Sequence, residues 1–161
     1  MTTKTTSMST SQVNSRNWLV IVAIVLTIIG MGITGYLTYT TLADKELICV
    51  ESGQLDCNAV QSSAYSEAFG IPVAALGLGA YVTFFLLLVL DGRIDFMTIY
   101  GPTILFMLTL FGVIYSAYLT YIEAFVLEKW CQYCVASAIL MVGLFIISAI
   151  RAWSVEDEEE L

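Results

Sequence analysis

The sequence predicts an all-α membrane protein: a four-helix transmembrane bundle with a cysteine-bearing extracytoplasmic loop. Three observations support this fold class. Hydrophobic residues make up 58% of the 161 residues, and the mean hydropathy of +0.84 is far above that of a soluble domain. Four apolar runs are each long enough for a bilayer-spanning helix, which needs about 20 residues. Charged residues are concentrated in the intervening links and the tails.

The four runs divide the chain into a leader, a membrane domain and a tail. Residues 1–17 are rich in Thr and Ser and predict a disordered leader. Residues 18–150 form the membrane domain, and residues 151–161 form an acidic tail that we expect to be solvated. The spans are expected at about residues 18–42, 72–90, 102–125 and 131–150.

Small residues recur at helical spacing along three of the spans. In the first span they are Ala23, Thr27, Gly30, Thr34 and Thr38, in the second Ala75, Gly79 and Thr83, and in the third Gly112, Ser116 and Thr120. Small side chains let helix backbones approach closely in a membrane. We therefore expect the first stripe to be a helix–helix packing face.

The basic residues predict the orientation. Those on the side of the termini are Lys4, Arg16, Arg93 and Arg151, and those on the other side are Lys45 and Lys129. The positive-inside rule therefore places both termini in the cytoplasm. All four cysteines then lie on the extracytoplasmic side, where disulfides persist.

The first loop, residues 43–71, is the longest polar segment inside the fold and carries Cys49 and Cys57. A loop of this length is usually functional or disordered. Asp56 is a good helix N-cap, so we expect a short helix from Cys57 towards Tyr65 along the membrane surface.

Cys131 and Cys134 form a C-x-x-C motif at the start of the last span. The two thiols lie one helical turn apart, close enough for a disulfide. The amides and dipole of a helix N-terminus favour a thiolate there. The chain contains no histidine, which excludes haem ligation by histidine, histidine metal centres and a histidine general base.

Three interpretations of the four cysteines remain open. A non-enzymatic four-span protein would use them for structural disulfides or for a zinc site with four cysteine ligands. A short C-x-x-C loop crosslinks too few residues to stabilise the chain much. In a redox relay, the loop pair would exchange disulfides with a soluble protein, and the helix pair would face a lipid-soluble oxidant. We favour the relay, with the loop as a mobile shuttle.

The ordered motifs resemble the vitamin K epoxide reductase family over roughly residues 18–150. They are Cys49-x7-Cys57, Val60, Ser62-Ser63, Phe69-Gly70-Ile71-Pro72 and Cys131-Gln132-Tyr133-Cys134. The resemblance implies a thiol–disulfide oxidoreductase that supports disulfide-bond formation. Its electron acceptor would be a quinone of the ubiquinone or menaquinone type, with no metal.

The resemblance also implies a role for each cysteine. Cys134 would be the thiolate next to the quinone, with Cys131 as its partner. Cys57 would exchange with Cys131, and Cys49 would meet the external thiol protein. The quinone pocket would lie among the outer helix ends, near Ser63, Phe69 and Pro72, with Leu76 and Ala138 as apolar lining.

Two departures from the vertebrate members affect the expected activity. The second span has no Asn, and Ala138 stands where those members carry a quinone-contacting Tyr. We therefore expect quinone reduction without epoxide reduction. Only an acidic tail follows Arg151, so we expect a separate thioredoxin-like or DsbA-like partner and no nucleic acid. The acidic, lysine-poor composition favours the plasma membrane of a prokaryote.

Overall fold

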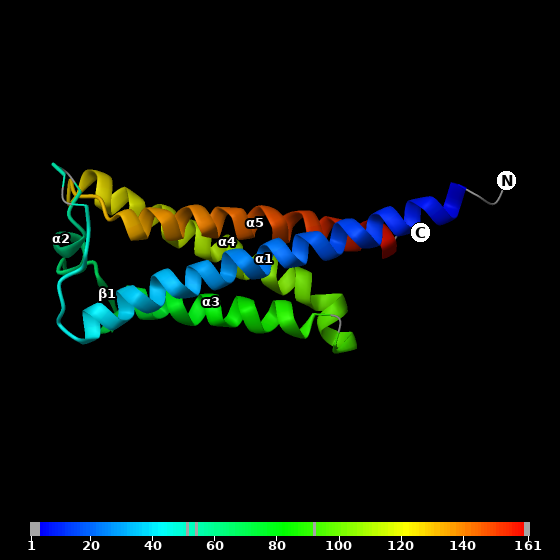
Figure 1. The fold of residues 1–161 in the computed structure, drawn as a ribbon, viewed down its shortest axis with the longest axis horizontal. Helices are drawn as coiled ribbons and strands as arrows, with labels where there is room; N and C mark the ends of the chain where they lie inside the picture. The colour runs from blue at the N-terminus through cyan, green and yellow to red at the C-terminus, as the bar shows by residue number, and fades with distance from the viewer. Residues whose placement is uncertain (1–3, 51, 54, 92, 160–161) are drawn as a thin grey trace.

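The computed structural model describes residues 4–159 except residues 51, 54 and 92. Four long helices form an elongated bundle, and three short elements lie between the first two of them (Figure 1). In chain order the elements are α1 (Lys4–Leu42), α2 (Cys57–Gln61), β1 (Glu67–Ala68), β2 (Ile71–Pro72), α3 (Val73–Leu90), α4 (Asp95–Phe125) and α5 (Gln132–Glu159).

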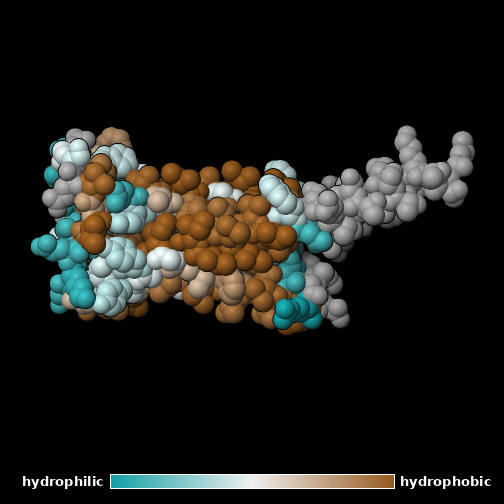
Figure 2. Space-filling model, viewed as in Figure 1, coloured by the Kyte–Doolittle hydropathy of each residue, from teal (hydrophilic) through white to brown (hydrophobic). Residues whose placement is uncertain are grey.

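The described residues contain four helical segments long and apolar enough to cross a membrane: Asn17–Leu42, Val73–Leu90, Tyr100–Phe125 and Gln132–Ser154. Figure 2 shows an apolar band across the middle of the visible face, with hydrophilic residues at both ends. In a bilayer, such a band faces the hydrocarbon core, whereas a soluble protein would expose polar residues there. The predicted fold class, an all-α four-helix membrane bundle, is confirmed.

Both chain termini lie at the same end of the bundle, opposite α2 and β1 (Figure 1). This arrangement follows from the even number of long helices. The loop that carries Cys49 and Cys57 and the turn before α5 therefore share the far end. The cysteines are gathered at one end of the molecule, whichever way it is inserted.

Three helices are longer than their predicted spans. α1 begins at Lys4 and α5 ends at Glu159, so most of the leader that we expected to be disordered is helical, and so is most of the acidic tail. Residues 1–3 and 160–161 lie outside the described residues. Neither extension contains Gly or Pro, and adding a residue to an existing helix is much easier than starting a new one.

α4 begins at Asp95 rather than near Pro102, which lies inside the helix. A proline in a membrane helix is tolerated where neighbouring groups compensate for the lost backbone hydrogen bond. Gly101 and Pro102 are both buried. The link between α3 and α4 is therefore shorter than the interval between the predicted second and third spans.

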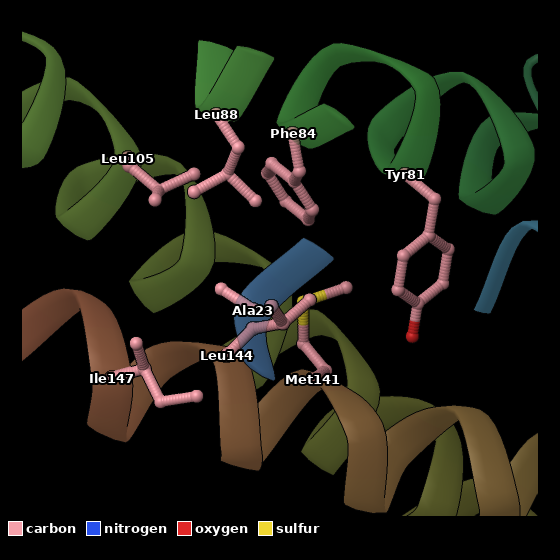
Figure 3. Close-up of a cluster of buried hydrophobic side chains, with 8 residues drawn as sticks. All are labelled: Ala23, Tyr81, Phe84, Leu88, Leu105, Met141, Leu144 and Ile147. Atoms are coloured by element: carbon pink, nitrogen blue, oxygen red, sulfur yellow. The ribbon is translucent and has the colours of Figure 1, made fainter. Parts of the chain in front are cut away.

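The main core joins all four long helices (Figure 3). Its buried members are Ala23, Tyr81, Phe84, Leu88, Leu105, Met141, Leu144 and Ile147. The Tyr81 hydroxyl donates a hydrogen bond to the Ser137 carbonyl at 3.0 Å, which ties α3 to α5. Thr27, Thr34 and Thr38 are also buried. The predicted packing face of the first span is thus confirmed.

Glycines permit the closest helix contacts. A Cβ atom at Gly30 would collide with the Tyr81 ring, and one at Gly112 would lie 2.7 Å from Met141 Sδ. Both glycines thus make room for a large side chain from a neighbouring helix. This explains why small residues are needed at these positions.

Candidate functional site

Cys49 and Cys57 are joined by a disulfide, with their Cα atoms 6.3 Å apart. Cys57 is the first residue of α2 and is buried, whereas Cys49 is half-buried. The Asp56 side chain caps α2 by accepting the backbone N–H of Ala59 at 3.0 Å. The predicted cap is therefore confirmed, although α2 ends at Gln61 and does not reach Tyr65. The cap fixes the turn that positions Cys57.

Cys131 and Cys134 are both free thiols. Cys131 directly precedes α5 and is fully buried, and Cys134 lies in the first turn of that helix and is half-buried. The Val135 N–H donates to the Cys131 carbonyl at 3.0 Å, which closes that turn around the motif. The two thiol side chains lie near each other at the start of α5. The spacing of the motif allows these two thiols to form a disulfide.

The loop cysteines and the helix cysteines are brought together by backbone pairing. Leu55 and Trp130 form a parallel β-bridge, and the Asp56 N–H donates to the Trp130 carbonyl at 3.1 Å. The residues that follow Asp56 and Trp130 are both cysteines. Cys57 and Cys131 accordingly belong to one buried cluster, against which Cys49 and Cys134 also pack.

Further contacts hold the segment around Cys49 against the helix ends. The Tyr133 hydroxyl donates to the Ile48 carbonyl at 2.8 Å, and the Leu47 N–H donates to Asn58 Oδ1 at 2.8 Å. The Tyr133 ring packs against Tyr36, with 5.6 Å between the ring centroids. The loop that we expected to be a mobile shuttle is thus tethered at defined points.

A cavity of about 490 Å3 lies beside the helix cysteines and opens to the outside. Such a volume is within the range of small-molecule sites, which are mostly apolar with a few polar groups. Its lining includes all the residues that the sequence assigned to a quinone pocket: Ser63, Phe69, Pro72, Leu76, Cys134 and Ala138. The structure gathers these residues around one space, and their role in binding stays a prediction.

The β1–β2 hairpin forms part of the cavity wall. Phe69 and Gly70 form its two-residue turn with φ angles of 57° and 77°, as a type I′ turn requires at both positions. The turn leaves the Phe69 side chain fully exposed while it also lines the cavity. The Val73 N–H donates to the Ser66 carbonyl at 2.8 Å, which connects the hairpin to the start of α3.

The sequence matches the Vitamin K epoxide reductase family over residues 21–149. The chain belongs to this family. It is also 32% identical over 120 residues to thiol-disulfide oxidoreductase LTO1 of Arabidopsis thaliana, an alignment that covers 71% of this chain and 32% of the relative. The chain thus corresponds to about a third of that relative's length. The resemblance predicted from the cysteine and Phe-Gly-Ile-Pro motifs is confirmed.

A buried glutamate near the end of α4 contacts the Cys131–Cys134 motif. Glu123 is 5% exposed, and its Oε2 accepts the backbone N–H of Cys131 at 3.2 Å. The Cys134 side chain also lies beside this carboxylate. Glu123 also lines the cavity. One carboxylate therefore contacts both residues of the free thiol pair.

Our sequence analysis did not assign a role to Glu123. The third span was expected to end near Phe125, and Glu123 is a single acid in its last turn, surrounded by apolar residues. An ionisable residue within a membrane span is costly and usually functional. The single acid in an apolar span was therefore a sequence signal for a functional role. Its proximity to Cys131 and Cys134 could not be predicted, because it depends on how α4 packs against α5.

Proposed function

We propose that the chain is a membrane thiol–disulfide oxidoreductase that passes electrons from a thioredoxin-like or DsbA-like protein to a quinone. The observation that carries this proposal is the arrangement of the cysteines. A loop disulfide adjoins a free thiol pair, and Cys134 of that pair opens onto an apolar cavity. Family membership and the similarity to a thiol-disulfide oxidoreductase support the same chemistry.

The relay consists of two disulfide exchanges and one quinone reduction. The dithiol of the soluble partner reduces the Cys49–Cys57 disulfide and itself becomes a disulfide. The resulting loop dithiol reduces a Cys131–Cys134 disulfide through a mixed disulfide between Cys57 and Cys131. The membership of these two residues in one buried cluster supports that step. Each exchange moves two electrons and two protons.

The described state, with an oxidised loop pair and a reduced helix pair, corresponds to the stage before quinone reduction. The helix dithiol then forms its disulfide and gives two electrons and two protons to the quinone, which leaves as a hydroquinone. Leu76, Pro72 and Ala138 would contact the quinone ring through apolar surface. The Ser63 hydroxyl, which donates to the Val60 carbonyl at 2.7 Å, would turn to donate to a quinone oxygen.

A zinc site built from all four cysteines fits the geometry less well. It would need four thiolates around one ion, but Cys49 and Cys57 are already bonded to each other. Among the described residues, no group of three or more His, Cys, Asp or Glu side chains is gathered closely enough to hold a metal ion.

We further propose that the protein lies in a prokaryotic plasma membrane with its termini in the cytoplasm. The excess of Lys and Arg on the termini side supports this orientation. The four cysteines would then face an oxidising compartment, in which protein disulfides form and persist. Either ubiquinone or menaquinone would serve as the electron acceptor.

The test is quinone reduction by the purified protein with dithiothreitol as electron donor. We expect the wild type to reduce ubiquinone or menaquinone analogues, and Cys134→Ala to abolish that turnover because the cavity loses its only thiol among the described lining residues. Formation of the Cys49–Cys57 disulfide in the variant is the control for folding. A folded Cys134→Ala protein with full turnover would refute the relay.

A further inference from the structure

Quinone reduction by two thiols requires proton transfer as well as electron transfer. When a disulfide forms from two thiols, two protons must leave the sulfur atoms, and a quinone that accepts two electrons must also accept two protons. In a cavity lined mainly by apolar groups, bulk water is a poor carrier of these protons. A side chain that contacts both the thiols and the cavity would serve instead.

Few groups at the site are able to carry a proton. The chain has no histidine. Among the described residues that line the cavity, Glu123 is the only carboxylate, and the remaining ionisable groups are the Cys134 thiol and the phenols of Tyr65, Tyr81 and Tyr115. The Tyr81 hydroxyl is already hydrogen-bonded to Ser137. Glu123 is therefore the group best suited to exchange protons near neutral pH.

The surroundings of Glu123 favour uptake of a proton. The side chain is 5% exposed, and the described part of the chain contains no ion pair to Glu123. A buried carboxylate without a cationic partner is costly. Its contacts are the Cys131 N–H at 3.2 Å and the Cys134 thiol. The Cys134 thiol therefore lies beside the group that would take its proton.

We propose that Glu123 is a catalytic proton carrier between the Cys131–Cys134 thiol pair and the quinone in the cavity. This inference rests on the proposed quinone reductase function. The carboxylate takes the proton of the Cys134 thiol and delivers it to one quinone oxygen. When the Cys131 sulfur bonds to that of Cys134, the ionised carboxylate takes the Cys131 proton and delivers it to the other oxygen. Two thiols and one quinone become one disulfide and one hydroquinone, and Glu123 ends ionised as it began.

Glu123 could instead have a purely structural role, and the two roles predict different effects of substitution. Glu123 also acts as an acceptor for the backbone N–H of Cys131 at the start of α5, and such a contact stabilises a helix end. Glu123→Gln separates the two roles, because a glutamine of equal length keeps an acceptor oxygen but cannot take the thiol proton. Glu128→Gln is the matched control, since Glu128 is an exposed glutamate in the link that follows α4.

The first experiment measures quinone reduction by the full-length protein with dithiothreitol as donor. General acid–base catalysis typically contributes about 10²–10⁴-fold, so we expect Glu123→Gln to lower kcat by at least about 10²-fold. The KM for the quinone should change little, because the shape and polarity of the cavity wall are kept. Glu128→Gln should match the wild type.

The second experiment uses chemical rescue of Glu123→Ala, which leaves space beside the thiols. Formate has a carboxylate that can take up and release a proton. Formamide has the same size and a hydrogen-bond acceptor, but it does not take up a proton near neutral pH. We expect formate to restore turnover in proportion to its concentration, and formamide to have no effect. Equal rescue by both compounds would show a structural role only and would overturn the inference.

The remaining outcomes separate this inference from the proposed function. If the wild type reduces quinone and Glu123→Gln retains its kcat, the proton-carrier role is wrong and the relay stands. If the wild type, with all four cysteines intact, reduces neither ubiquinone nor menaquinone analogues, the proposed function itself fails.

Discussion

The backbone N–H of Asp56 donates to the carbonyl of Trp130 at 3.1 Å, and each of these residues directly precedes a cysteine. This one hydrogen bond sets the first loop beside the start of α5. It places Cys57 and Cys131 in the same buried cluster. Disulfide exchange requires close access of one sulfur to another, and this pairing brings the two cysteines into one part of the structure.

The close contact between α1 and α3 should make Gly30 sensitive to substitution. A Cβ atom there would collide with the buried Tyr81 ring, whereas a Cβ atom at Gly32 meets nothing within 4 Å. Overpacking a tight core costs about 1–3 kcal/mol, so Gly30→Ala should lower the thermal stability of the detergent-solubilised protein. Gly32→Ala is the control and should leave it unchanged or slightly higher. Equal effects of both variants would contradict the described packing.

The two adjacent serines of the first loop should differ in their effect on turnover. Ser63 lines the cavity and Ser62 is exposed away from it. A hydrogen bond contributes about 0.5–1.5 kcal/mol. Ser63→Ala should therefore lower kcat/KM for the quinone by roughly two- to tenfold, and Ser62→Ala should have no effect. Negligible effects from both would remove Ser63 from the quinone site.

The orientation of the protein is testable with a membrane-impermeant maleimide. After mild reduction of intact cells, the reagent should label Cys49, the more accessible cysteine of the loop pair, if that end of the bundle is extracytoplasmic. A Cys49→Ala variant serves as the labelling control. Labelling that appears only after permeabilisation would show the opposite orientation. The cysteines would then not face an oxidising compartment.

Much of the fold could be predicted because membrane spans depend on local properties. The four apolar runs gave the positions of the transmembrane segments, and the stripe of Thr27, Thr34 and Thr38 gave a packing face that is buried in the structure. Helix ends were less predictable. Beyond the bilayer core, hydropathy does not show where a helix stops, and α1 and α5 continue into polar sequence.

The site could be predicted only in part. Residues with recognisable motifs, such as Cys134 and Ser63, do line one cavity. The contact of Glu123 with Cys131 and Cys134 depends on the packing of two helices and on the turn between them. The same holds for the bridge between Leu55 and Trp130. Neither contact could be predicted from the sequence. Each joins two segments that are distant in the chain, and the pattern within one segment does not show where the other segment lies.

The central claim is the order of the relay, from the loop pair to the helix pair and then to the quinone. Its most direct test is quinone reduction by Cys49→Ala with two alternative donors. A thioredoxin-like dithiol protein should fail as donor because it needs the loop pair, whereas dithiothreitol should restore turnover because it is small enough to reach Cys134 through the cavity. If dithiothreitol fails to support turnover in a folded Cys49→Ala protein with a reactive Cys134, the loop pair is more than a shuttle and the proposed order is wrong.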